Sequence, residues 1–588
     1  MIERKTFTFD GENSADYGLY ISGDSVYNAP NREIDMVSIP GRNGQLAIDM
    51  GRYENITVTY PAFVIADTQA EFREKIRRIR NWLCSKTSYQ RLTDDYNPES
   101  FRLGLYKSGL EVEPIFYNRC GEFEMSFDCQ PQRFLFTGEE VFTLGEWGET
   151  ETYSGSIVSF EGTETTAIKT LNASIVPKQS GSGDPSPSNV RPISGTDTVN
   201  VTVSNLNYID ESTNESGAID ANGNNTTNAS FNRTQLIPIK NGIDATFKVF
   251  SAPASSNIRI HGYSANGSWL RQLALVYTTG SDMTQAITIG DDVYYIRISY
   301  PTNALGMVLL CQGTAPSTMI THQGDTYTTS LGQTVYGGTL DVVSGKLIID
   351  SAKIVYDGTL PIALINWAPS SNGVGWAYGY IRSYNKIVSD TVVPKIYSDK
   401  LKASSYGDMF NGRVTNAVGV YSNNSYGIFI RTSDTSLTTV EAVNAYLSAN
   451  PITVVYELAT PIEIQLTPTE VKTLLGNNNI WANSGTVEVE IGENPYILVN
   501  PTKFEACPIF EVEGAGTLSI GDTTLTISNT GTTIIDTEMM EAYEDDNGAI
   551  ISRNDEVEGG FPTLNSGVNT IDTDGLTSVK VTPKWWEL

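Results

Sequence analysis

The chain has 588 residues, a length that predicts about three to five domains rather than one. It holds 39 basic and 68 acidic residues, so its formal net charge is −29. A charge of this sign repels the phosphates of nucleic acids and the surfaces of anionic membranes. We therefore expect neither a nucleic-acid-binding surface nor insertion into a membrane.

The cysteines and the amino terminus indicate where the protein is made. The chain has 5 cysteines, few for its length and odd in number, unlike the framework of a disulfide-rich secreted protein. Residues 1–14 lack the apolar core of a signal peptide, and no apolar run approaches the roughly eighteen residues that cross a bilayer. We expect synthesis in the cytosol without a secretion signal.

Composition and alternation predict a mostly β fold built from several sandwiches. The chain has 51 glycines and 30 tyrosines, and it is rich in Thr, Val, Ile, Ser and Asn, which favour strands and tight turns. Apolar residues alternate with polar ones at 55–64, 485–491 and 516–527. Every second residue of these segments would face a core.

The first of three predicted helices runs from Thr68 to Cys84. Apolar residues recur on one face of it, and Thr68 with Glu71 forms a capping box. A second helix is predicted for 439–448, because the Asn450-Pro451 pair stops it. A third, short helix is predicted for 467–476, where Thr-Pro-Thr-Glu begins it and a glycine ends it.

The polar face of the first helix is strongly basic. Five cations, Arg73, Lys75, Arg77, Arg78 and Arg80, fall within eight residues of an acidic protein. Such a stripe is either a solvated or salt-bridged helix face, which we favour, or a contact with acidic neighbouring subunits. Arg73, Arg77 and Arg80 are the candidates for that subunit interface.

Charge and composition divide the chain. Residues 1–140 hold 16 basic and 22 acidic residues, whereas 495–588 hold only 4 basic and 16 acidic ones. The stretch 178–195 is rich in Ser, Gly and Pro, which indicates an exposed loop or linker. We expect an amino-terminal domain at 1–144, a linker and start of an insertion at 145–199, an inserted β-sandwich or jelly roll at 200–322, a second inserted β domain at 323–494, and a carboxy-terminal domain at 495–588.

Little in the sequence supports catalysis or a cofactor. The two histidines, His261 and His322, lie in unrelated contexts, and no spacing typical of a zinc, nucleotide or nucleophile motif occurs. We expect no catalytic residues, no metal and no cofactor, although a pair of carboxylates could still serve a glycosidase. The acidic stretches 544–548 and 572–575 could hold calcium, but Asn-Gly and Asp-Gly favour hairpin turns there.

Two aromatic segments are candidates for stacking sugar rings. Trp376, Tyr378 and Tyr380 fall at every second position, so on a strand they share one face. Exposed, such a row would bind sugar; buried, which we favour, it would fill a sandwich core. Tyr263, Trp269 and Arg297 form the second candidate patch, with aromatic and hydrogen-bonding groups.

Motifs at both ends of the chain resemble those of phage distal tail proteins, the Dit family. They follow the family's order over about 230 residues, which is more specific than any single motif. The motifs are FTFDG (7–11), SADYGLYI (14–21), IPGRNG (39–44), YQRLTDD (89–95), GEFEMSFDCQPQRF (121–134) and FPTLNSGVNTI (561–571).

This resemblance implies a structural role in a virion. Distal tail proteins form hexameric rings that join the tail tube to the tip or baseplate hub, and their carboxy-terminal domain is a galectin-like β-sandwich. The long members carry insertions similar to carbohydrate-binding modules, so the resemblance implies that the inserted domains bind host surface glycans. The implied partners are five further copies of the chain, the tube protein, the tail-tip hub protein and receptor-binding proteins.

Two rival functions remain open from the sequence. The insert could be a tail-associated glycan depolymerase, which would release reducing ends from host cell-wall polysaccharide. It could instead be purely structural, with its aromatic rows buried against neighbouring tail proteins. A galectin-like fold by itself does not guarantee sugar binding.

Overall fold

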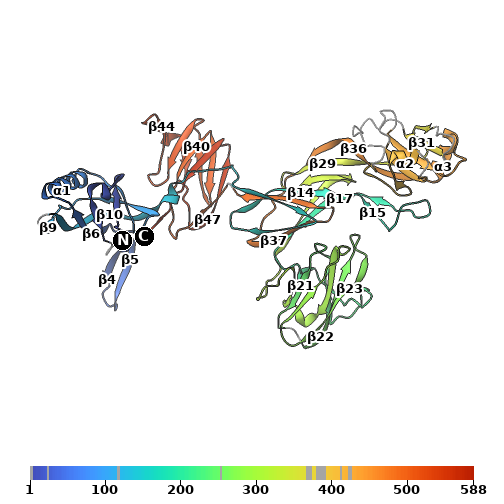
Figure 1. The fold of residues 1–588 in the computed structure, drawn as a ribbon, viewed down its shortest axis with the longest axis horizontal. Coiled ribbons are helices and arrows are strands. Elements are labelled where there is room, and N and C mark those ends of the chain that lie inside the picture. The colour runs from blue at the N-terminus through green and yellow to red at the C-terminus, as the bar shows by residue number, and fades with distance from the viewer. Residues whose placement is uncertain are drawn as a thin grey trace. The chain divides into compact units, whose positions relative to one another are not determined.

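The structure is a computed structural model that describes residues 4–22, 26–115, 119–251, 254–365, 374–378, 393–410, 414–420, 427–494 and 496–588. The predicted mostly β fold is confirmed, because strands dominate every part of the described chain (Figure 1). Two compact units make up the molecule. One combines residues 1–148 with 494–588, and the other contains 149–493.

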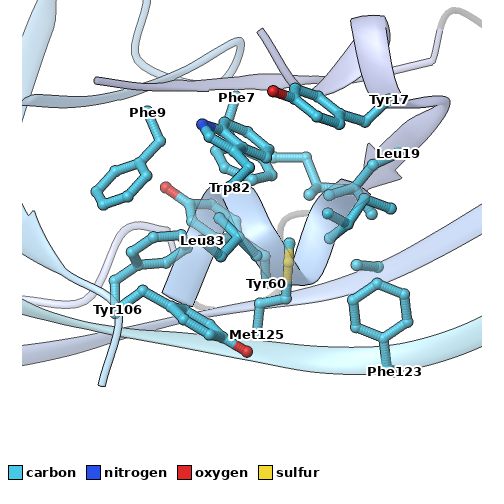
Figure 2. Close-up of a cluster of buried hydrophobic side chains, with 14 of the residues drawn as sticks. Phe7, Phe9, Tyr17, Leu19, Tyr60, Trp82, Leu83, Tyr106, Phe123 and Met125 are labelled. Carbon is cyan, nitrogen blue, oxygen red and sulfur yellow. The ribbon is translucent and has the colours of Figure 1, made fainter. Parts of the chain in front are cut away.

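One sheet and one helix form the amino-terminal domain. The sheet order is β2 (Glu12–Asn13), β1 (Phe7–Phe9), β7 (Gln90–Asp94), β8 (Ser100–Leu105), β10 (Cys120–Leu135), β6 (Ile56–Ile65) and β3 (Leu19–Ile21), and β9 (Glu113–Ile115) and β49 (Trp586–Glu587) also pair with β10. Strand β6 alternates between buried and more exposed residues, as its sequence predicts. Figure 2 shows the core, in which Trp82 stacks on Tyr17 at a centroid distance of 4.5 Å and on Phe7 at 5.5 Å.

The predicted first helix is confirmed as α1 (Gln69–Cys84). Thr68 caps it by accepting a hydrogen bond from the Glu71 backbone N–H, and the Glu71 carboxylate accepts one from the N–H of Asp67. Its apolar face is buried in the domain core through Phe72, Ile76, Ile79, Trp82 and Leu83. The remaining face carries the five cations.

A hairpin arm projects from this domain. Strands β4 (Arg32–Ser38) and β5 (Gln45–Tyr53) pair only with each other (Figure 1). Paired residues share a face, so Met36 and Ala47 lie on one side of the arm, while Val37 and Leu46 lie on the other. Both sides carry exposed large apolar side chains, namely Ile34, Met36, Val37, Leu46, Ile48 and Met50. An isolated hairpin of this kind is marginal in water.

The carboxy-terminal domain is a β-sandwich. One sheet has the order β11 (Phe142–Thr143), β48 (Ser578–Thr582), β40 (Ile509–Glu513), β43 (Thr532–Asp536), β44 (Glu541–Asp546), β45 (Ala549–Ser552). The other is β39 (Ile497–Asn500), β47 (Gly567–Asp574), β41 (Gly516–Ile520), β42 (Thr523–Ile527), β46 (Val557–Gly559). A single buried cluster that includes Phe510 and Leu518 lies between them. The predicted turn at 544–548 is confirmed, since Asn547 and Gly548 both have positive φ between β44 and β45.

The second unit is built on a base sandwich. Its larger sheet has the strand order β12 (Thr150–Gly155), β38 (Val487–Glu493), β14 (Thr166–Ile175), β28 (Gly338–Asp341), β29 (Lys346–Tyr356), β36 (Ile452–Gln465) and β32 (Ile396–Ser398). Its smaller sheet has the order β13 (Ile157–Gly162), β37 (Gly476–Ala482), β17 (Thr196–Ser204) and β27 (Gly324–Val335). Thr150 pairs with Gly492, so the chain enters and leaves this unit on neighbouring strands.

Two further modules are inserted into connections of the base sandwich. Residues 205–323, between β17 and β27, hold a six-stranded sheet containing β22 (Ala254–Tyr263), β23 (Trp269–Thr279) and β25 (Tyr295–Pro301), and a three-stranded sheet of β24 (Met283–Ile287), β21 (Ala245–Val249) and β26 (Val308–Gln312). Residues 357–451 hold the sheet β30 (Ile362–Ile365), β31 (Val374–Tyr378), β35 (Ile428–Thr432), β34 (Ala417–Val420), β33 (Lys402–Ala403), with α2 (Tyr406–Phe410) and α3 (Val440–Ala449).

The segment 145–199, expected as a linker and the start of an insertion, contributes β12, β13, β14 and β17 to the base sandwich. Within it, 178–195 is not an interdomain linker. It forms the hairpin of β15 (Lys178–Gln179) and β16 (Ile193–Ser194), whose loop is tied by Arg191 to three backbone carbonyls and is joined to Asp399 by a 2.7 Å backbone hydrogen bond. The Ser, Gly and Pro content of this stretch predicts its exposure, but it does not predict the contact with Asp399, which is distant in sequence.

Of the other two helix predictions, one is confirmed and one is wrong. Helix α3 begins after Thr439, which caps it, and ends before Asn450-Pro451. The segment 467–475 is not helical. It crosses the base sandwich with Val471 in the core, and the backbone N–H of Thr469 donates to the carbonyl of Val342 at 3.1 Å. These tertiary partners replace the hydrogen bonds of a helix.

Candidate binding surfaces

The sheet register places the second predicted patch on one face of the 205–323 module. Tyr263 pairs with Trp269, and His261, two residues earlier on β22, pairs with Arg297 on β25. All four side chains therefore lie on the same face of the six-stranded sheet. The structure thus brings Tyr263, Trp269 and Arg297 together.

A loop packs against this face and covers part of it, so the face is only in part an open aromatic platform. Tyr263 is 5% exposed, whereas Trp269 is 39% exposed and its indole N–H donates to Nδ1 of His261 at 3.1 Å. A Cβ on Gly223 would lie 2.3 Å from the Trp269 ring, which shows how closely the loop backbone lies against that ring. Arg297 is also engaged, because it donates to the Thr234 carbonyl and to the Asn225 side-chain oxygen.

His261 gives this covered face a dependence on pH. Burial lowers the pKa of His261 to about 4, and the Arg259 and Arg297 charges add to the effect, while Asp220 opposes it. The folded state therefore holds a neutral imidazole, whereas the unfolded chain binds a proton below a pKa of about 6.5. This contribution to stability is complete above pH 6.5 and is lost as the pH falls toward 4.

We expect His261→Gln, which removes the titrating group, to flatten the fall in stability of the full chain between pH 6.5 and 4.5. The difference between the two proteins should change by up to about 2 kcal/mol over this range, discounted for partial solvent screening. Urea unfolding at several pH values measures it. Parallel pH profiles would contradict a buried neutral His261.

The first predicted aromatic row, Trp376, Tyr378 and Tyr380, cannot be placed as a surface. Trp376 and Tyr378 lie on β31, which pairs with β30 and β35. Their side chains and the whole of Tyr380 lie outside the described residues. The assignment of this row to sugar binding or to the core therefore stays a prediction.

A different aromatic residue lines a polar hollow in the second unit. This hollow, of about 330 Å³, is bordered by the half-buried Trp481, by His322 and Asp325, and by residues 234–238. His322 Nδ1 contacts the Asn207 carbonyl oxygen at 2.6 Å. In the described part of the chain, no hydrogen bond occupies the indole N–H of Trp481, and no hydrogen bond or ion pair occupies the Asp325 carboxylate.

Sequence reasoning did not find the Trp481 hollow. Its lining comes from segments that begin at Thr202 and end at Trp481, so no local motif contains it. Two observations explain why it exists. Tyr208 donates a 3.1 Å hydrogen bond to Asn479, and the Asn479 side chain donates to the Asn205 carbonyl at 2.9 Å, so the entry to the inserted module is fixed against β37.

The cations of α1 divide into two groups. Arg77 forms an ion pair with Glu74 at 2.6 Å, and Lys75 forms one with Glu71 at 2.8 Å. Arg78 lies over the Tyr17 ring. Arg73 and Arg80 are exposed, and the described part of the chain supplies neither with an ion-pair partner within 4.0 Å. Of the three predicted interface candidates, these two could therefore form ion pairs with acidic groups of another subunit.

No cluster of three or more metal-ligating side chains occurs within the described ranges, and no helix there is long and apolar enough to span a membrane. Of the five cysteines, only Cys84 is exposed, and all five are free.

Residues 12–129, which form most of the amino-terminal domain, match the family model of the phage tail protein RIFT-related domain. The amino-terminal domain is therefore similar to a domain of phage tail proteins, which agrees with the resemblance of the chain to distal tail proteins. No curated protein matches the chain.

Solved structures of phage tail tips are similar to the chain. SPP1 Dit (gp 19.1), described as a hub of the adsorption apparatus in phages infecting Gram-positive bacteria, is 12% identical, with a TM-score of 0.20 over 52% of this chain and 99% of that one. The phage P2 baseplate in its activated conformation with Ca is 10% identical, with a TM-score of 0.20 over 54% of this chain and 99% of that one. Superposed as wholes these chains agree poorly, so the domain match carries the assignment.

Proposed function

We propose that the protein is a structural subunit of the phage tail tip, that its amino-terminal domains assemble into a hexameric ring, and that this ring joins the tail tube to the host-recognition apparatus. The β4–β5 arm is the observation that carries the proposal. It exposes large apolar side chains on both faces, and apolar area that stays exposed to water does not stabilise a monomer. Between two neighbouring copies, both faces would be covered.

The native mass of the full chain tests this proposal. At high protein concentration we expect a species of six times the 64.2 kDa of one chain. A second protein, in which a short linker replaces 149–493, should form the same ring, because Thr150 and Gly492 lie on paired strands and the junction is easily closed. Monomers of both proteins at every concentration would overturn the ring.

We infer as a second function that the inserted unit binds host surface glycans. The Trp481 hollow supports this, because it combines an indole ring with a carboxylate and an imidazole, the groups that stack on and hydrogen-bond to a sugar ring. Six copies in one ring would bind a dense glycan surface by avidity, even if each site is weak. The Trp269 face supports such binding less well, because Tyr263 is buried and the Trp269 indole N–H is already bonded to His261.

The two tryptophans give a matched test on arrayed bacterial glycans. We expect Trp481→Ala to reduce binding of the full chain at least about tenfold, since loss of a stacking ring costs about 1–2 kcal/mol per site. Trp269→Ala should leave binding within twofold. A loss in Trp269→Ala alone would assign binding to the Trp269 face, and no binding by the unaltered chain would overturn glycan recognition.

A catalytic insert would be recognised by the product that it releases. If the insert were a depolymerase, reducing ends would appear when host cell-wall polysaccharide is incubated with the protein. We expect none, and their release would replace the binding function with hydrolysis.

A further inference from the structure

An acidic hollow lies on the surface of the amino-terminal domain. Four glutamates, Glu111, Glu113, Glu122 and Glu124, line a space of about 820 Å³ together with Phe63 and Val112 of the same domain. The register of β9, β10 and β6 explains the cluster. Glu122 lies opposite both Glu113 and Phe63. Like charges on neighbouring strands destabilise a sheet.

These glutamates have no counter-charge among the described residues of the domain. All four are exposed, and no cation of the described residues lies within 4.0 Å of any of them. The only other polar side chains that line the hollow are Ser22 and Ser126. An arrangement that concentrates four negative charges around an apolar floor is better explained by a cationic partner than by the isolated domain.

A basic pocket of complementary character lies beside it. Arg73 and Arg80, the two unpaired cations of α1, flank a space of about 420 Å³ whose floor is apolar. The floor is made by Phe72, Ile76, Leu110, Val112 and Pro114. Val112 lines both spaces, so the acidic hollow and the basic pocket lie on either side of the segment 109–114.

We propose that these surfaces are the two halves of one contact between copies of the chain, in which Arg73 and Arg80 of one subunit enter the acidic hollow of the next. This inference rests on the proposed ring and names the charged contact that would complement the β4–β5 arm. Each copy presents both halves, and in the proposed ring the pairing repeats from subunit to subunit until the ring closes. Charge complementarity favours a second copy, because both halves are on the same domain of this chain.

Charge reversal tests the pairing in the full chain. One variant carries Arg73→Glu and Arg80→Glu, a second carries Glu122→Arg and Glu124→Arg, and a third carries all four substitutions. All four side chains are exposed, so each variant should fold, which circular dichroism and thermal melting check. Arg77→Glu is the control on the same helix, because Arg77 is outside the pocket and pairs with Glu74.

Native mass spectrometry and sedimentation should then show a specific pattern. Each of the first two variants alone should need at least about a hundredfold higher concentration to assemble, since like charges in an interface cost several kcal/mol. An equimolar mixture of them should assemble into rings of alternating composition. The four-substitution chain should assemble alone, as should Arg77→Glu.

The outcomes separate this contact from the ring itself. If the reversed variants assemble as well as the unaltered chain, the ring stands and the proposed contact is wrong. If they fail and neither the mixture nor the four-substitution chain restores assembly, the two surfaces are not partners. If the unaltered chain never assembles, the proposed ring is overturned, and this contact with it.

Discussion

Aspartate at both Met36 and Ile48 is expected to abolish assembly of the full chain while leaving its circular dichroism spectrum unchanged. The two side chains lie on opposite faces of the β4–β5 arm and are 50% and 43% exposed. In a ring both become buried, and each buried side chain of this size stabilises the contact by about 1.5–3 kcal/mol. Two buried carboxylates would add a desolvation cost, so assembly should weaken by at least about a thousandfold. Sedimentation over a range of concentrations measures this.

A matched control distinguishes the arm from a general effect of surface charge. Met539→Asp with Ile550→Asp removes two side chains that are 66% and 64% exposed on the carboxy-terminal domain, outside the arm. We expect this protein to assemble as the unaltered chain does. Persistence of the six-chain species in the Met36 and Ile48 variant would show that the arm is not buried in the ring.

Trp82→Ala should unfold the amino-terminal domain well before the rest of the chain. Trp82 is 5% exposed and stacks on Tyr17 and Phe7, with Phe9 at its edge (Figure 2). Truncating it leaves a large cavity between α1 and the sheet, at a cost of about 3–5 kcal/mol. That is a large share of the stability of a single domain, so assembly should be lost as well.

Several domains unfold in this chain, so one melting temperature does not report the effect. Hydrogen exchange of the β6 and β10 amides follows the amino-terminal domain directly. Trp82→Phe, which keeps an aromatic ring against Tyr17, should lose less than half as much protection. Equal protection in the alanine variant and the unaltered chain would show that Trp82 does not hold α1 on the sheet.

Local sequence determined the elements whose partners lie nearby. The apolar face and the Thr68 cap define α1, and Thr439 with Asn450-Pro451 defines α3. Alternation defines β6, and Asn547-Gly548 defines a hairpin turn. These signals succeed because each depends on residues within a few positions of one another. The order of motifs at the two ends likewise indicated a phage tail protein, and the match of residues 12–129 to a phage tail domain agrees with it at the amino-terminal end.

Only the tertiary structure decided what the candidate surfaces are. The cap signals at 467–476 were outweighed by the burial of Val471 and by backbone hydrogen bonds to the 341–345 turn. Aromatic and hydrogen-bonding side chains suggested a patch of Tyr263, Trp269 and Arg297, but Tyr263 is buried and a loop from elsewhere in the module packs against Trp269 and Arg297. The Trp481 hollow and the two charged surfaces beside Val112 are assembled from segments that are distant in sequence or on different elements. Burial and charge pairing depend on such distant neighbours, and no local pattern encodes them.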